Sequence, residues 1–207
     1  MSAWPFDSLI EWAQSQPGAQ LVLFGSRAVD AAGPRSDWDL LLVCDRSLRI
    51  AESNRHLDLV RLDVNEIVSR RWLGSELAGH IAAHGKWLVG KGVWTNHVFH
   101  SKRAIERKAT RIIRRFAALR SRWTDLPMAR RVIFATLVRR DLQRFKRLID
   151  GLAVPPAPIL DREWADRPGP EDLDCLTAAL RDEPSLLRRA SPAAIQKLDS
   201  IGGLTAI

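Results

Sequence analysis

Two carboxylates with a single residue between them are the clearest candidates for chemistry in this sequence. Asp37 and Asp39 begin an apolar run, ten residues after a Gly25-Ser26 pair that ends another apolar run. Residues i and i+2 of a strand share a face, so both carboxylates point one way and Trp38 points the other way. Neighbouring carboxylates raise one another's pKa unless a cation lies between them. Because oxygen ligands suit Mg²⁺ or Mn²⁺, the spacing predicts a divalent-metal site of the kind that works with nucleotide phosphates.

The Gly25-Ser26 pair supplies a complementary part of such a site. Glycine permits a tight turn and a close approach of the backbone to a ligand. The backbone N–H groups that follow, at the start of a short helix expected over 26–32, can hold phosphate oxygens. Ser26 adds a hydroxyl, and Arg27 either adds a charged contact or points into solvent. We therefore expect Gly25, Ser26 and Arg27 to bind the nucleotide.

A third carboxylate comes from residues 57–64, which alternate between apolar and polar types and predict a further strand. Asp58 and Asp63 are five residues apart, so on an unbroken strand they face opposite sides. Asp58, between Leu57 and Leu59 in the more apolar part, is the one we expect at the site. There it would bridge a metal or accept the proton of an attacking hydroxyl.

Taken together, these residues resemble the minimal nucleotidyltransferases of the DNA polymerase beta superfamily. The resemblance rests on Gly25-Ser26, Asp37-Trp38-Asp39 and Asp58, and on the later HGKWLVG segment at 84–90. It covers roughly residues 5–92. It implies transfer of a nucleoside monophosphate from a nucleoside triphosphate, with Asp37, Asp39 and Asp58 as catalytic metal ligands and Gly25 and Ser26 on the triphosphate. Where many relatives continue with Ala-Arg-Gly, this chain has Ala28-Val29-Asp30, which leaves Arg27 or Arg35 to contact the phosphates.

The elements that would position these residues divide the chain in two. Residues 1–99 alternate helix and strand (helices 6–16 and 74–84; strands 21–25, 38–44, 57–64 and 86–90) and predict a nucleotidyltransferase domain with a small mixed sheet. Residues 100–207 predict a helical domain: a hairpin over 101–149, a Pro-rich connector over 151–170 and short helices over 171–200. The fold class is α+β, with a helix-flanked sheet followed by an all-α extension.

The net charge of +8 is concentrated in that hairpin. Residues 100–149 hold 16 basic and 3 acidic side chains, whereas residues 1–99 carry −1 and residues 150–207 carry −4. A solvated helical face is one explanation, and a surface that binds a polyanion or an acidic partner is the other. The candidate contacts are on the first helix of the hairpin: Lys102, Arg103, Arg107, Arg111, Arg114 and Arg115.

The remaining titratable residues suggest no second site. His80 and His84 have the i, i+4 spacing of zinc ligands, but without a third ligand we expect them to be surface histidines. Two cysteines cannot build a disulfide framework. The apolar runs are too short for a membrane span and the N-terminus lacks a basic signal-peptide region, so we expect a cytoplasmic protein with no membrane partner.

The sequence thus favours a Mg²⁺- or Mn²⁺-dependent enzyme that transfers a nucleotide, with ATP as the expected donor, to a macromolecular hydroxyl. The acceptor would be an RNA end or an acidic protein, including a HEPN-type toxin in a toxin–antitoxin pair. The alternative is a non-catalytic, antitoxin-like protein that binds RNA or a toxin. A basic surface disfavours cationic antibiotics as substrates. The exposed hairpin also allows pairing with a second copy of the chain.

Overall fold

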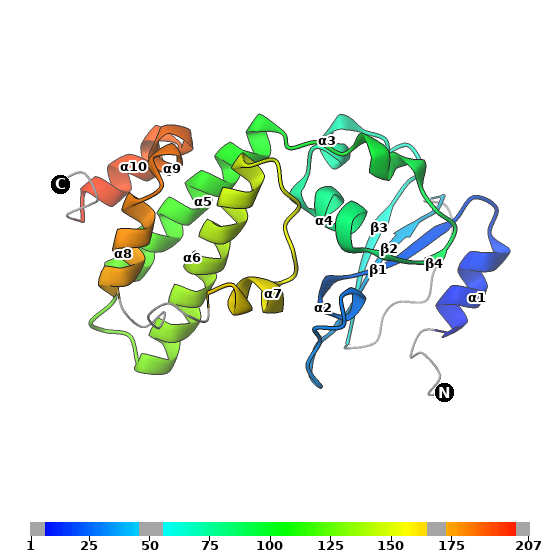
Figure 1. Ribbon diagram of the computed structural model, residues 1–207, viewed down its shortest axis with the longest axis horizontal. Coiled ribbons are helices and arrows are strands. Elements are labelled where there is room, and N and C mark those ends of the chain that lie inside the picture. Colours follow the sequence, from blue (N-terminus) through cyan, green and yellow to red (C-terminus); the bar gives the residue numbers. More distant parts are fainter. Residues whose placement is uncertain (1–6, 46–55, 165–172, 202–207) are drawn as a thin grey trace. The chain divides into compact units, whose positions relative to one another are not determined.

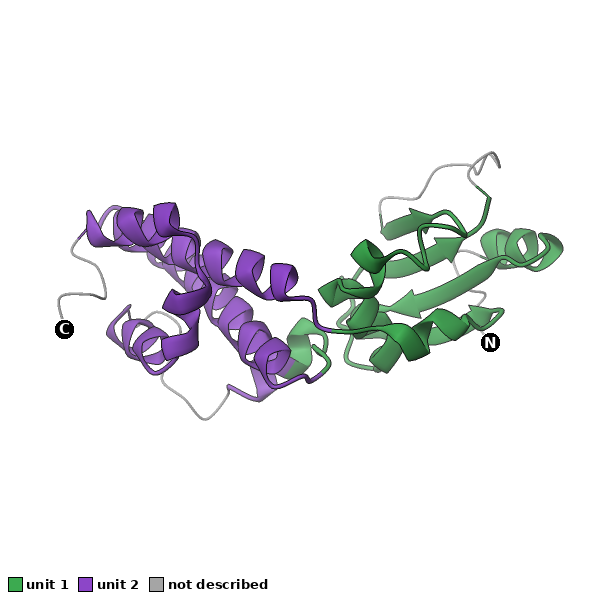
Figure 2. Cartoon of the chain, turned by 90° about the horizontal axis from the view of Figure 1, so that it is seen from above, with its two compact units in different colours: residues 1–99, 153–159 green, residues 100–152, 160–207 purple. Residues whose placement is uncertain are grey.

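The computed structural model describes residues 7–45, 56–164 and 173–201, and these form two compact units (Figure 2). The first unit comprises residues 1–99 together with 153–159, and the second comprises 100–152 together with 160–207. The segment 153–159, which the sequence placed in the Pro-rich connector, therefore returns to the first unit. Residues 165–170 of that connector lie outside the described residues.

A four-stranded mixed sheet forms the centre of the first unit (Figure 1). Its strands are β1 (Gln20–Phe24), β2 (Trp38–Val43), β3 (Leu57–Leu62) and β4 (Lys86–Val89), in the order β3-β2-β1-β4. Strand β1 runs antiparallel to β2 and β4, while β2 and β3 are parallel. This arrangement confirms the α+β class and the small mixed sheet.

The alternating side chains of β1 and β2 fill two cores, one on each face of the sheet. Leu21, Leu23, Leu40 and Leu42 pack with α1 (Asp7–Ser15) on one face. Val22, Leu41 and Val43 pack on the other face with α3 (Arg70–Leu73), α4 (Glu76–His84) and the 3₁₀ helix η1 (Val93–His97). Helix α4 begins at Glu76, because Ser75 accepts a hydrogen bond from the Ala78 N–H and caps its first turn.

The second unit is helical, with α5 (Lys102–Arg120) and α6 (Met128–Ile149) forming the expected hairpin (Figure 1). Apolar side chains at helical spacing, including Ile112, Phe116, Leu142 and Phe145, are buried between elements of this unit. The chain continues through α7 (Ala157–Arg162), α8 (Leu173–Arg181), α9 (Pro184–Arg189) and α10 (Pro192–Asp199). None of the described helices is long and apolar enough to span a membrane.

Two details of the helices differ from the sequence expectation. The connector contains the short helix α7, whose Asp161 pairs with Arg139 and Arg140 of α6. The sequence predicts one helix over 184–200, but the structure breaks it at Ala190, whose ψ of 155° is extended. Pro192 then begins α10, and a proline at this position is compatible only with the start of a helix.

Candidate active site

Asp39 and Asp58 lie directly opposite each other on two neighbouring strands. Asp39 is the second residue of β2 and Asp58 the second residue of β3, and the two are direct partners in the parallel ladder. Partners in a ladder point to the same face of a sheet. Asp37 immediately precedes β2, two residues from Asp39. The register therefore brings the three predicted carboxylates to one end and one face of the sheet.

These carboxylates differ in their exposure to solvent. Asp37 and Asp58 are exposed, whereas Asp39 is half-buried. Burial raises the pKa of Asp39 to about 6, and the negative charges of Asp58 and Asp37 add to this effect, while Arg27 opposes it. Asp39 is thus the carboxylate at which a further positive charge would be most stabilising.

The Gly25 turn lies directly against Asp39. Gly25 follows Phe24, which is the partner of Asp39 across the β1–β2 pair. It has a φ of +73°, and a Cβ at this position would lie 2.0 Å from the Asp39 Oδ2 atom. Glycine is therefore required both by the backbone conformation and by the close approach of the carboxylate. Ser26, next in the chain, is half-buried in the short helix α2 (Gly25–Ala28).

His80 holds this turn from the opposite side, and the expectation that it is a surface histidine is wrong. Its side chain is buried on α4, and its Nε2 accepts a hydrogen bond from the Gly25 N–H at 3.3 Å. Its Nδ1 lies 2.6 Å from the Val154 carbonyl oxygen, so we assign the proton to Nδ1. His80 therefore joins the turn to the returning segment 153–159. The signal available in the sequence was the position of His80 beside Ala78 and Ile81 on the buried side of α4.

Arg27 is turned towards the protein and not into solvent. Its guanidinium donates to the Ser36 carbonyl at 2.6 Å and 3.1 Å and to the Asp37 carbonyl at 3.2 Å. It also stacks on Trp38, with Cζ 4.1 Å from the ring centroid. Arg27 thus fixes the segment that carries Asp37 while contributing positive charge near Asp39.

His56 is a neighbour of the carboxylates that the sequence reasoning did not select. Its Nδ1 lies 3.9 Å from the Asp37 Oδ1 atom, and its carbonyl accepts a hydrogen bond from the Trp38 N–H. Both side chains are largely exposed to solvent. Its position two residues before Asp58, on the same face of an extended segment, was the available signal.

The chain segment that contains all of these strand and turn residues matches a known family model. Residues 9–78 match the model of the nucleotidyltransferase domain. The match spans Gly25, Ser26, Asp37, Asp39 and Asp58, and it supports nucleotidyl transfer as the general activity, with a nucleoside triphosphate as substrate. No curated protein matches the chain.

The first unit also has a hollow on the Trp38 side of β2. This hollow has a volume of about 430 Å³. A second, larger hollow of about 700 Å³ lies in the helical unit. The lining residues of the smaller hollow are Leu23, Arg27, Asp30, Ala32, Trp38 and Lys86. Lys86 and Asp30 form an ion pair at 2.9 Å across it. Arg27 covers one face of Trp38.

No group of three His, Cys, Asp or Glu side chains in the described residues is arranged to enclose a metal ion. Proteins usually hold Mg²⁺ with one or two carboxylates while water and substrate phosphates complete its coordination. The raised pKa of Asp39 and the hard oxygen ligands of the three aspartates suit such an ion.

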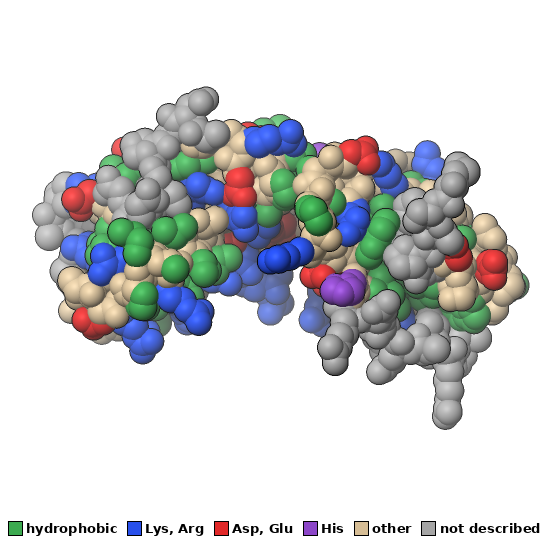
Figure 3. Space-filling model, turned by 90° about the horizontal axis from the view of Figure 1, so that it is seen from below, with side chains coloured by type: hydrophobic (Ala, Val, Ile, Leu, Met, Phe, Trp, Pro, Cys, Tyr) green, Lys and Arg blue, Asp and Glu red, His purple; other side chains and the backbone are tan. Residues whose placement is uncertain are grey.

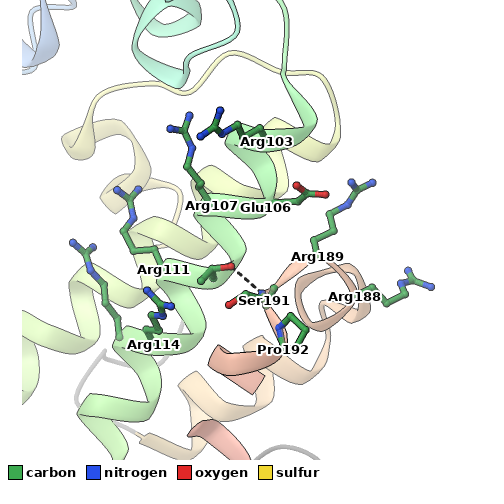
Figure 4. A pocket seen from close by; sticks show the side chains of 12 residues that line it. Arg103, Glu106, Arg107, Arg111, Arg114, Arg188, Arg189, Ser191 and Pro192 are labelled. Carbon is green, nitrogen blue, oxygen red and sulfur yellow. Dashed lines mark hydrogen bonds between the residues drawn. The ribbon is translucent and has the colours of Figure 1, made fainter. Parts of the chain in front are cut away.

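The predicted polyanion contacts lie on α5 of the helical unit. Arg103, Arg107, Arg111, Arg114 and Arg115 line one groove there, together with Arg188 and Arg189 of α9 (Figure 4). The sequence reasoning missed the last two, because they are about 75 residues further along the chain. Lys102 is not among the lining residues and pairs with Glu106 at 3.8 Å.

Proposed function

We propose that the nucleotidyltransferase domain transfers a nucleoside monophosphate from a nucleoside triphosphate to a hydroxyl of a macromolecule, with the aid of a divalent metal ion. The observation that carries this proposal is the half-buried Asp39 between two further carboxylates and against the Gly25 turn. A carboxylate kept in such surroundings is costly for folding, and a bound cation would offset that cost.

In this proposal Asp37 and Asp39 are the main ligands of Mg²⁺ or Mn²⁺, and Asp58 is a further ligand. When bound, the ion neutralises charge that develops on the transferring phosphoryl group. Gly25 and Ser26 face the triphosphate. The Gly25 N–H already donates to His80, so amides later in α2 would contact the phosphate oxygens. Arg27 keeps Asp37 in place through the backbone.

The reaction itself is an in-line displacement at the α-phosphorus. The acceptor hydroxyl oxygen forms the new bond to phosphorus, the bond to the bridging oxygen breaks, and pyrophosphate leaves. The hydroxyl proton passes to Asp58 or to water. Asp58 suits this role because it is exposed beside Asp39, where an incoming acceptor can reach it.

The acceptor proposed is an RNA end or a hydroxyl of an acidic protein, with ATP as the donor. The strong positive charge of residues 100–149 supports a negatively charged partner and disfavours a cationic antibiotic. A toxin–antitoxin pair, in which the chain modifies a partner toxin, is consistent with the same charge.

The proposal is tested by incubating the full chain with each α-labelled nucleoside triphosphate, Mg²⁺ or Mn²⁺, and RNA or protein acceptors. Label should enter an acceptor, EDTA should prevent this, and Asp39→Ala should lower the rate at least 100-fold with an unchanged circular dichroism spectrum. Asp150→Asn, an exposed acid at the end of α6, is the matched control. Absence of both label transfer and nucleotide binding would exclude the enzyme and favour the non-catalytic alternative.

A further inference from the structure

The groove on the helical unit is built from two segments that are far apart in the sequence. It measures about 700 Å³ and lies where α5 meets the end of α9 and the start of α10. The Ser191 N–H donates to the Thr110 hydroxyl at 2.9 Å and joins the two segments at its floor. In Figure 4, Arg107, Arg111 and Arg114 extend on one side of α5, and Arg188 and Arg189 extend on the side where α9 lies.

The basic residues of this groove are all arginines, and most of them are not paired with an acidic side chain among the described residues. Arg103, Arg107, Arg114, Arg188 and Arg189 form no ion pair with any described residue, and Glu106 is the one acidic residue in the described lining. Figure 3 shows Lys and Arg side chains in several places over the helical unit. A concentration of uncompensated cations disfavours the compact state unless a polyanion binds there.

A buried ion cluster holds the remaining two arginines in position. The side chains of Lys108 and Asp141 are almost fully buried, and the Lys108 Nζ atom lies 3.2 Å from the Asp141 Oδ1 atom. Arg111 and Arg115 also pair with the Asp141 carboxylate, and Arg144 lies 3.8 Å from it. Arg111 and Arg115 share one carboxylate, so they are held in position and together contribute positive charge to the groove.

The composition of the groove indicates what kind of polyanion it fits. Among the described lining residues, none is aromatic, and Ala190 and Pro192 are the apolar ones. The fully buried centre of a protein interface is usually apolar or aromatic and poor in charged residues, and binding of single strands commonly relies on stacking of bases. Neither is provided by these lining residues. Arginine forks, in contrast, bind phosphate oxygens in a bidentate manner.

Successive arginines of α5 are also spaced for a repeating anion. Arg103, Arg107 and Arg111 are one helical turn apart, which corresponds to steps of about 6 Å along the helix axis. We propose that this groove binds the sugar-phosphate backbone of a double-helical nucleic acid, without reading its sequence. The groove shares no residue with the carboxylate site, so binding here can be tested separately from nucleotidyl transfer.

The experiment compares the full chain with two triple variants of equal charge. The groove variant is Arg107→Gln, Arg114→Gln and Arg188→Gln, and the control is Arg122→Gln, Arg130→Gln and Arg181→Gln; all six arginines are exposed. Binding of fluorescent 20-base-pair RNA and DNA duplexes of two sequences is measured by anisotropy from 50 to 300 mM salt, and thermal melting checks that each variant is folded.

We expect the groove variant to bind at least 10-fold more weakly than the control, and its salt slope to fall by about 3, since each phosphate contact contributes about 0.9 to the slope. The two duplex sequences should bind alike, and Asp39→Ala should bind as the unchanged chain does. Equal losses in the groove and control variants would overturn the proposal. So would tighter binding of a polyglutamate peptide than of either duplex, which would instead indicate an acidic protein partner.

Discussion

Gly25 leaves open the space that the carboxylate of Asp39 occupies. A Cβ on Gly25 would lie 2.0 Å from the Asp39 Oδ2 atom and 2.9 Å from its Cγ atom. The two residues meet because Phe24 and Asp39 are partners across the β1–β2 pair, so the chain turns at Gly25 beside the end of β2. The turn and the half-buried carboxylate are therefore parts of one arrangement, and a change in either affects the other.

Gly25→Ala should inactivate the nucleotidyltransferase domain and destabilise it more than a matched glycine change elsewhere. The control is Gly18→Ala, because Gly18 has a φ of +72° and a Cβ added there would meet no described atom within 4 Å. We expect Gly18→Ala to cost about 1 kcal/mol through backbone strain alone. Gly25→Ala adds a steric conflict with Asp39. In urea unfolding, its loss in the free energy of unfolding should therefore be at least twice that of Gly18→Ala. Equal losses would show that Asp39 moves away freely.

The pKa of Asp39 predicts the acid limb of the rate profile. Since burial and the charges of Asp58 and Asp37 raise that pKa to about 6, the metal-free carboxylate is largely protonated below this pH. Metal and proton compete for the same oxygens, so raising Mg²⁺ from 0.1 to 10 mM should move the acid limb of kcat/KM to lower pH. A limb near pH 4 at the lowest metal concentration, unchanged by added metal, would contradict the assignment of Asp39.

Much of this site followed from spacing along the sequence, and the remainder came from contacts between distant segments. Asp37, Asp39 and Gly25 lie at the ends of apolar runs, where strand periodicity predicts their face. The pairing of Asp39 with Asp58 required the parallel register of β2 and β3, which a single sequence does not give. Strand pairing and helix packing depend on contacts between side chains that are far apart in the sequence. Local propensity does not predict such contacts.

His80 and Arg188 illustrate that limit. A histidine four residues from another histidine has the same pattern whether it faces solvent or accepts the Gly25 N–H, and its Val154 contact is 74 residues away. Arg188 joins the arginines of α5 because α9 packs on α5, although the sequence places it in a mildly acidic tail. The helix break at Ala190–Ser191 was visible as Ser191 and Pro192, but the longer apolar pattern outweighed them.

Asp39→Asn should make the folded chain more stable at neutral pH while it abolishes transfer. The pKa of Asp39 is raised above that of an unfolded chain, so the folded state binds the extra proton between about pH 4 and pH 6, and stability falls as pH rises through this window. Above pH 6 the charged form costs on the order of 1 kcal/mol after allowance for solvent screening of this half-exposed group.

The neutral amide removes that cost, so the thermal melting temperature of Asp39→Asn at pH 8 without metal should exceed that of the unchanged chain. The difference should shrink as pH falls below 6 and disappear below about pH 3, where Asp39 is protonated in both the folded and the unfolded state. Asp150→Asn provides the comparison for loss of an exposed acid. A lower melting temperature of Asp39→Asn at pH 8 would mean that the carboxylate makes a stabilising contact.

His80 should act as a positioning residue, since it accepts a hydrogen bond from the Gly25 N–H, in the turn that lies against Asp39. His80→Leu leaves that N–H and the Val154 carbonyl without the imidazole, and an unpaired buried polar group costs about 1–3 kcal/mol. We expect the KM for the nucleoside triphosphate to rise as the turn loosens. In His80→Gln the amide oxygen can accept the Gly25 N–H, so this variant should recover part of the lost affinity.

The control for His80 is His97→Leu, at an exposed histidine of η1. The measurement pairs steady-state kinetics with hydrogen exchange at the Gly25 amide, which should become faster in His80→Leu and return towards its original rate in His80→Gln. A merely structural role would lower the melting temperature of both His80 variants without this separation in exchange rate and KM. Unchanged exchange at Gly25 in His80→Leu would show that the turn is held by its own backbone conformation, at φ +73°, and that His80 serves only to anchor segment 153–159.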